Sequence, residues 1–334
     1  MSIQLKQILL NNVADAYIAS TGIQKAAELA YALKRPLLLS GEPGTGKTRF
    51  AYYLADSLKG KGFNKNPLVF NTKTTSVAQD LFYHYDAIAQ FRDNNLAGRA
   101  QETATASPST SQAKTTADYI QLKELGLAMA NAIGGNNLTS LETSIQKNSR
   151  LSVSPASSVV LIDEIDKAPR DFPNDLLNEL ERFEFSIKEI NFQLPQLTDE
   201  QKGRILIVLT SNYEKNLPDA FLRRCVYYHI PFPDDKILRQ IIRKRLDMPD
   251  NGSDNDFKAL IGDFFTIRNH EGLQKKPSTA EAVDLVAALR EDDLIGKNND
   301  LRLLNEKKKA PEHIIPYLSV LLKKQEDLQL FIEQ

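Results

Sequence analysis

The sequence predicts an α/β protein, an αβα sandwich around a central parallel sheet, followed by a smaller all-helical domain. Five short runs rich in Val, Ile and Leu alternate with segments of helical spacing, as expected for buried parallel strands joined by helical crossovers. The runs span residues 37–39, 68–70, 159–162, 205–209 and 226–230. Beyond the fifth run the pattern is helical throughout, so we expect no further strand there.

A pair of prolines marks the boundary that we expect between the two domains. Pro231 and Pro233 follow the fifth run, and proline cannot donate to a strand ladder and disfavours a helical predecessor. We therefore expect an α/β domain over residues 1–232 and a helical domain over residues 233–334. Helical spacing in the second domain covers residues 237–246, 257–265, 280–289 and 313–331.

An insertion of about residues 92–156 separates the second run from the third. Its part over residues 97–118 is rich in Thr, Ser, Ala and Gln, and has too few apolar side chains to offset the entropy of ordering. We expect that part to be mobile. Residues 119–133 follow with helical spacing.

Composition and charge argue against several classes of function. The net charge of −1, from 42 basic and 43 acidic side chains, gives no overall field for nucleic acid or an anionic membrane. The single cysteine, Cys225, cannot form an intramolecular disulfide, so a cytoplasmic location is expected. No segment approaches the roughly 20 apolar residues of a membrane span. No zinc-ligand spacing is present either.

A glycine-rich loop follows the first strand and precedes a helix predicted from the spacing of Phe50, Leu54 and Leu58. Backbone N–H groups of such a loop can surround phosphate oxygens, and the positive end of the next helix adds a favourable field. Lys47 would neutralise the terminal phosphates and the Thr48 hydroxyl would hold Mg²⁺. The loop predicts ATP binding by Gly41, Glu42, Pro43, Gly44, Thr45, Gly46, Lys47 and Thr48.

Two carboxylates end the third strand. Asp163 and Glu164 are costly at the edge of a buried sheet unless a cation lies there, and Mg²⁺ is the obvious candidate. Asp163 would reach the metal through water, and Glu164 could accept a proton from the attacking water. The alternative is that the pair only begins the helix announced by Pro169 and Asp171.

Polar residues also follow the fourth strand. Asn212 could hydrogen-bond a water or a γ-phosphate oxygen without adding charge, although Ser-Asn after a strand is also ordinary turn chemistry. Further along, Arg223 and Arg224 lie side by side before the fifth strand. A guanidinium suits the charge of a phosphoryl transition state and is often lent by a neighbouring subunit, whereas the alternative is a surface pair.

Together these motifs resemble the MoxR-like branch of the AAA+ ATPases over most of the chain. The segments that carry the resemblance are GEPGTGKT, VVLIDEIDKAPRDFPNDLL, LTSN and PDAFLRRC. It implies Mg²⁺-dependent ATP hydrolysis, a helical lid, ring oligomers that are usually hexamers, and a partner protein of the von Willebrand A type. It also implies that Arg224 is the arginine finger and that a hairpin precedes LTSN, where residues 183–194 alternate.

The chain departs from the family where a lid arginine is expected. The corresponding stretch contains Lys275 and Lys276 followed by a capping box of Ser278 and Glu281, and no arginine. Lysines just before a helix oppose its dipole, which suggests that Lys276 or Lys275 faces the nucleotide phosphates. Exposed lysines without that role are the alternative.

The sequence thus predicts an ATPase that remodels or assembles a partner protein. One alternative is an ATP-dependent switch or scaffold with little turnover. A second is an AAA+ motor on nucleic acid, against which the neutral charge argues. A small-molecule kinase is a third, although it would have no need of Asn212, an arginine from a neighbour or a helical lid.

Overall fold

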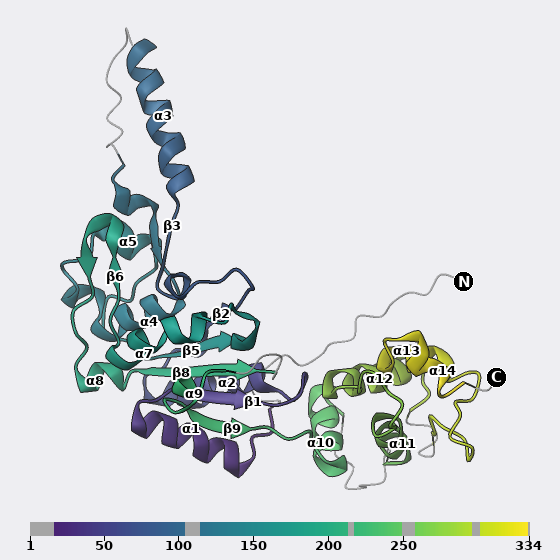
Figure 1. Cartoon of the computed structure of the whole chain (residues 1–334). Helices are drawn as coiled ribbons and strands as arrows, with labels where there is room; N and C mark the ends of the chain where they lie inside the picture. The colour runs from purple at the N-terminus through teal and green to yellow at the C-terminus, as the bar shows by residue number, and fades with distance from the viewer. Residues whose placement is uncertain (1–16, 104–113, 213–216, 249–257, 296–300, 333–334) are drawn as a thin grey trace. The chain divides into compact units, whose positions relative to one another are not determined.

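The computed structural model describes residues 17–103, 114–212, 217–248, 258–295 and 301–332. The chain divides into two compact units, which are described separately below (Figure 1). The sheet unit comprises residues 20–40 and 48–229. The lid unit comprises residues 41–47 and those from 230 onward, together with residues 17–19.

The sheet unit contains a five-stranded parallel sheet in the order β2-β5-β8-β1-β9. This confirms the predicted fold class and all five predicted strands, which are β1 (Leu37–Ser40), β2 (Leu68–Asn71), β5 (Ser158–Asp163), β8 (Ile205–Ser211) and β9 (Val226–His229). The prediction that all five are fully buried is wrong for β2 and β9, whose residues are half-buried or exposed. Both lie at an edge of the sheet, so each has one strand neighbour.

Both faces of the sheet are buried. Leu38, Val160 and Ile207 belong to one large apolar cluster, whereas the alternate residues Leu37 and Leu161 are equally buried outside it. On the cluster side, α4 (Glu124–Ile133) packs against β2, β5 and β8. α1 (Thr21–Leu33) packs against β1 and β9, and α2 (Lys47–Leu58) buries the apolar face predicted from its spacing. Shorter helices are α5 (Thr143–Asn148), α6 (Phe172–Asp175), α7 (Leu177–Arg182), α8 (Asp199–Lys202) and α9 (Asp219–Leu222).

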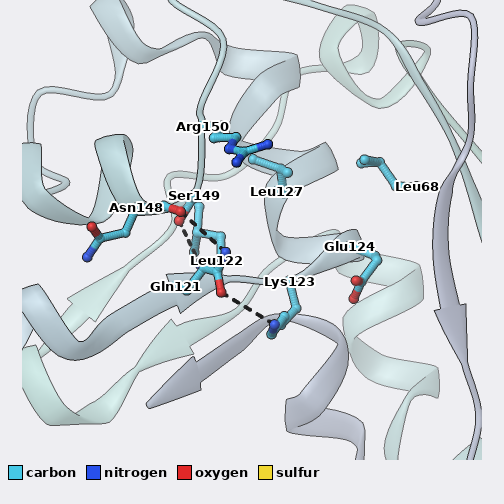
Figure 2. A pocket seen from close by; sticks show the side chains of 9 residues that line it. All are labelled: Leu68, Gln121, Leu122, Lys123, Glu124, Leu127, Asn148, Ser149 and Arg150. Atoms are coloured by element: carbon cyan, nitrogen blue, oxygen red, sulfur yellow. Dashed lines mark hydrogen bonds between the residues drawn. The ribbon is translucent and has the colours of Figure 1, made fainter. Parts of the chain in front are cut away.

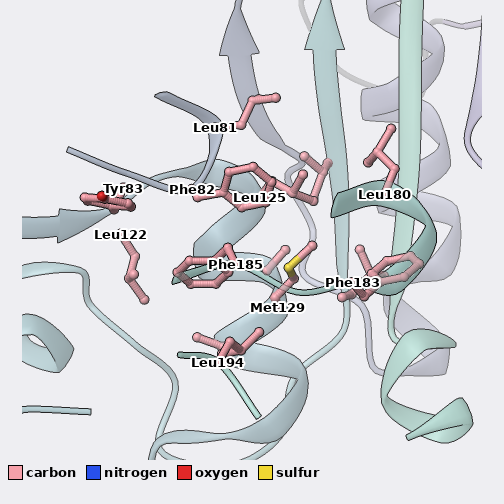
Figure 3. Packing of buried hydrophobic residues seen from close by; sticks show 14 of the residues in the cluster. Leu81, Phe82, Tyr83, Leu122, Leu125, Met129, Leu180, Phe183, Phe185 and Leu194 are labelled. Atoms are coloured by element: carbon pink, nitrogen blue, oxygen red, sulfur yellow. The ribbon is translucent and has the colours of Figure 1, made fainter. Parts of the chain in front are cut away.

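The cluster continues into the insertion. Figure 3 shows the rings of Phe82 and Phe185 beside Leu125 and Met129 of α4. The two rings stack with their centroids 5.4 Å apart. Aromatic side chains bury large apolar areas, so this layer fixes α4 on the sheet.

The insertion differs from its prediction at both ends. α3 (Ala87–Thr103) carries helical backbone into the segment expected to be mobile, and η4 (Thr116–Tyr119), a short 3₁₀ helix, forms at the segment's other end. Asp93 joins the two parts by accepting from Lys114 at 2.8 Å and from the Tyr119 hydroxyl at 3.0 Å. Residues 104–113 lie outside the described residues.

The helix expected over residues 119–133 begins later than predicted. Residues Ile120–Leu122 form β4, which pairs antiparallel with β3 (Tyr83–Tyr85). Buried and exposed residues alternate in β4, as they do in a strand. Three residues are too few to distinguish the two-residue period of a strand from the 3.6-residue period of a helix. The predicted hairpin is confirmed: β6 (Ser186–Ile187) pairs antiparallel with β7 (Phe192–Gln193).

The lid unit is helical in its described part from residue 230 onward, as expected. Its helices are α10 (Asp235–Arg245), α11 (Lys258–Arg268), α12 (Thr279–Glu291), α13 (Ile315–Leu321) and α14 (Gln325–Gln329). The single helix expected over residues 313–331 is instead two, because Leu322 adopts an extended conformation after α13. The capping box is confirmed, with Ser278 accepting from the Glu281 N–H and the Glu281 carboxylate accepting from the Ser278 N–H. In the ranges that the structure describes, no helix has the length and apolar character needed to cross a membrane.

Replacing Gly126 with Ala tests how closely α4 approaches the β3 segment. A Cβ at Gly126 would overlap the backbone carbonyl of Phe82, so we expect Gly126→Ala to lower the free energy of unfolding by about 1–3 kcal/mol. Gly262 lies within α11, and no atom of the described residues lies within 4 Å of where an added Cβ would be, so Gly262→Ala is the matched control, with an expected gain of about 0.5–1 kcal/mol. Urea unfolding measures both. Equal effects of the two substitutions would contradict the close packing of α4.

Candidate functional site

The parallel pairing of β5 with β8 places the ends of these two strands side by side. The register pairs Ile162 with Leu209, so the next residues, Asp163 and Thr210, are neighbours across the sheet. β1 pairs with β8 on its other side. The carboxyl ends of parallel strands share one edge of the sheet, which is where α/β proteins bind ligands.

A carboxylate and two hydroxyl groups form the centre of this edge. The Thr48 hydroxyl donates to Asp163, at 2.9 Å from Oδ1 and 3.1 Å from Oδ2. The Thr210 hydroxyl donates to Oδ1 of the same carboxylate at 2.6 Å. Asp163 is therefore held from α2 and from β8 together. The sequence predicted Asp163 and Thr48, but not Thr210.

Glu164 lies one residue further on, with its backbone in the left-handed region at φ 55°. Its N–H donates to the Thr210 hydroxyl at 2.8 Å, and its Oε1 accepts from the Asn212 side-chain amide at 3.1 Å. Its Oε2 accepts from the ammonium of Lys167. The carboxylate is thus oriented by an amide on one oxygen and a cation on the other.

Asn212 is itself fixed by its backbone. Its N–H donates to Oδ2 of the buried Asp166 at 2.9 Å, in η6 (Ile165–Lys167) directly after Glu164. Asp163 ends β5, and Glu164 precedes η6 and bonds across to β8 and the residue that follows it. The structure brings Thr48, Asp163, Glu164 and Asn212 together, as expected.

The glycine-rich loop belongs to the lid unit in the division of the chain. Gly44 has φ 79°, a conformation that costs glycine nothing and other residues much. The ammonium of Lys47 is buried and donates to the backbone carbonyls of Gly41 and Glu42, at 2.8 and 2.9 Å. The backbone of the loop thus surrounds the ammonium group of Lys47, which is also the first residue of α2.

The residues of the sheet edge fit a magnesium ion that is shared with a nucleotide. Among the described residues, no group of three or more Asp, Glu, His or Cys side chains gathers as a metal site. Mg²⁺ is however usually held by one or two protein oxygens together with substrate phosphates and water. Thr48 gives its only hydroxyl proton to Asp163, which leaves lone pairs of its oxygen for a cation.

The two candidate finger arginines lie apart from this network. Arg224 forms an ion pair with Glu181 and donates to the Ala220 carbonyl at 2.9 Å. Its hydrogen bond lowers the pKa of the Glu181 carboxyl. Arg223 is exposed at the end of α9. In the described part of the chain, neither arginine bonds to Asp163, Glu164 or Asn212.

The lid unit holds an arginine that sequence reasoning missed. Arg268 ends α11 with only 6% of its side chain exposed, and its guanidinium lies 3.5 Å from the centre of the Phe232 ring. It bonds to the Pro277 carbonyl and to the Glu42 carboxylate, all within the same unit. Lys275 pairs with Glu281 at 3.2 Å, and Lys276 is exposed. The signal in the sequence that could have indicated Arg268 is a single arginine at the end of the largely apolar helix α11.

A cavity of about 470 Å³ is lined mostly by residues of the insertion. None of the predicted site residues is part of its lining. Figure 2 shows it between β4, the start of α4 and the end of α5, with Leu68 of β2 at one side. Burial raises the pKa of Glu124 in its wall. Lys123 and Arg150 also line it, so its charges are mixed and favour no single kind of ligand.

Three solved structures are similar to this chain at low sequence identity. NtrX from Brucella abortus in complex with ADP shares 11% identity, with a TM-score of 0.47, and the match covers 96% of this chain and 63% of NtrX. PCH-2 of C. elegans shares 13%, with a TM-score of 0.38, over 93% of this chain and 66% of that one. Domain III of the Thermotoga maritima replication initiation protein DnaA shares 12%, with a TM-score of 0.40, over 98% and 100%. This chain thus spans just under two thirds of the first two proteins.

A match to a protein family assigns the chain to the AAA+ ATPases. No curated protein sequence matches the chain. Residues 36–225, more than half of the 334 residues, match the family described as AAA domain (dynein-related subfamily). The AAA+ part of the resemblance is therefore confirmed, while its MoxR-like part stays a prediction. The chain belongs to the dynein-related AAA domain family, and so to the nucleotide-binding AAA+ ATPases.

Proposed function

We propose that the chain hydrolyses ATP with Mg²⁺ and that water is activated by Glu164. The observation that carries this proposal is the hydrogen-bonded network at the sheet edge, in which Glu164 and Asp163 are both oriented by residues of the neighbouring strand. Preorganised groups lower a barrier because they need no reorganisation during the reaction.

Each group has a distinct task in this proposal. The loop over residues 41–47 binds the phosphates through its N–H groups, and Lys47 exchanges loop carbonyls for phosphate oxygens. Thr48 and Asp163 hold Mg²⁺, which would neutralise phosphate charge. Glu164 accepts the proton of the attacking water, and Asn212 orients that carboxylate or the water. The motif GEPGTGKT includes both Lys47 and Thr48, which supports a role of both residues in binding one nucleotide.

The energy of hydrolysis is used, in this proposal, to remodel or assemble a partner protein. The MoxR-like motifs support a ring, usually of six subunits, and a partner with a von Willebrand A domain. The near-neutral charge argues against nucleic acid, and a cytoplasmic location agrees with the single cysteine. In the lid unit, Arg268 joins Lys275 and Lys276 as a candidate for sensing the nucleotide, since it already bonds to Glu42 of the loop.

A second candidate function is an ATP-dependent switch with little turnover. The ion pair of Lys167 with Glu164 favours it, because a cation on the carboxylate competes for the lone pair that would accept a proton. Both side chains are partly exposed, at 39% and 36%, so solvent weakens the pair. We therefore place hydrolysis first.

Glu164→Gln should keep ATP binding and lose turnover by about 100-fold or more, because the amide preserves the shape of the side chain and cannot accept a proton. Lys47→Ala is the matched comparison, and should lose binding itself, since it removes the loop cation. Calorimetry and phosphate release measure the two properties separately. Normal turnover of Glu164→Gln would remove this residue from the mechanism.

Arg224→Ala should bind ATP and assemble normally, yet hydrolyse about 10³ to 10⁵ times more slowly, if Arg224 serves the neighbouring subunit. Mixing it with Glu164→Gln should restore activity, because an Arg224→Ala site can then face an intact Arg224. Arg223→Ala, the adjacent exposed arginine, is the control and should stay active. Mixed rings confirmed by native mass spectrometry but as inactive as either parent would show that Arg224 does not act between subunits.

A further inference from the structure

We propose that Thr210 is a positioning residue: its hydroxyl fixes the Asp163 carboxylate so that Asp163 and Thr48 can hold Mg²⁺ with a nucleotide. The inference rests on the proposed function and adds a residue to its site. Thr210 lies within the LTSN segment, but the sequence motifs assigned it no role of its own. The pairing of β5 with β8 places its hydroxyl beside Asp163.

The two hydrogen bonds of Thr210 determine the direction of its proton. The hydroxyl accepts from the Glu164 N–H at 2.8 Å and lies 2.6 Å from Asp163 Oδ1. An ionised carboxylate can only accept, so the single hydroxyl proton points to Asp163. The side chain is fully buried, which excludes water as a competing partner. Thr210 therefore has one orientation that satisfies both neighbours.

This one hydroxyl controls two features of the site. It restricts the Asp163 carboxylate from the β8 side, while Thr48 bonds to the same carboxylate from α2. It also anchors the backbone of Glu164, which adopts the uncommon left-handed conformation. Outer partners of this kind orient the groups that hold a metal, and their loss typically costs about 10–100-fold in metal affinity or activity.

Thr210→Val tests the hydroxyl without changing the shape of the side chain, and Thr210→Ser keeps the hydroxyl. The matched control is Thr72→Val, because Thr72 is also buried and its N–H donates to the Asp163 carbonyl at 3.2 Å. The Thr72 hydroxyl has no hydrogen-bond partner among the described residues. Both substitutions thus remove a buried hydroxyl beside Asp163, and only one removes a bond to its carboxylate.

The readout is binding of a non-hydrolysable ATP analogue, AMPPNP, by calorimetry with Mg²⁺ and with EDTA. In the wild type, we expect Mg²⁺ to tighten binding. Thr210→Val should lose about 10-fold or more of that enhancement, while binding in EDTA stays unchanged. Thr210→Ser and Thr72→Val should keep the enhancement. Unchanged binding in EDTA also shows that the variant is folded, and Thr210→Ala provides a second hydroxyl-free side chain if Thr210→Val does not fold.

Three results would overturn the inference. The first is an undiminished Mg²⁺ enhancement in the hydroxyl-free variants. The second is an equal loss in Thr210→Ser, which would assign the effect to the methyl group. The third is an equal loss in Thr72→Val, which would assign it to general packing. A wild type that binds no AMPPNP would instead contradict the proposed function itself.

Discussion

The parallel pairing of β5 with β8 is the constraint on which the candidate site depends. It places Asp163 beside Thr210 and Glu164 beside the segment that ends in Asn212. A shift of this register by one residue would turn each side chain to the other face of the sheet. The close fit of the buried side chains on both faces of these strands opposes such a shift, so the packing of the core helps to set the geometry of the site.

The charged side chains of the candidate site, in each of the two units, form hydrogen bonds or ion pairs with nearby groups. In the sheet unit, Glu164 accepts from a neutral amide and from a lysine, so its two oxygens have partners of different strength. In the lid unit, Lys47 bonds to carbonyls of its own loop, and Arg268 bonds to Glu42 and packs on Phe232. Lys47 and Arg268 are buried, and buried charges without partners are costly, which explains why these two have close partners.

Much of this architecture could be predicted from the sequence, because strand runs and the glycine-rich loop are local patterns. The lateral order of the strands is not local, so the half-exposed edges β2 and β9 were expected to be buried. Residues 120–122 were predicted to be helical and form a strand instead, since the pattern of three residues cannot distinguish a strand from a helix. The roles of Thr210 and Arg268 could not be predicted, because they depend on contacts with residues far away in the sequence.

Release of inorganic phosphate by the wild-type protein tests directly whether this chain hydrolyses ATP, as we propose. It should be followed over a range of protein concentrations, with Mg²⁺ and with EDTA. We expect phosphate release that requires Mg²⁺ and a specific activity that rises with protein concentration as neighbouring subunits meet. Tight binding of ATP without Mg²⁺-dependent phosphate release at any concentration would contradict it.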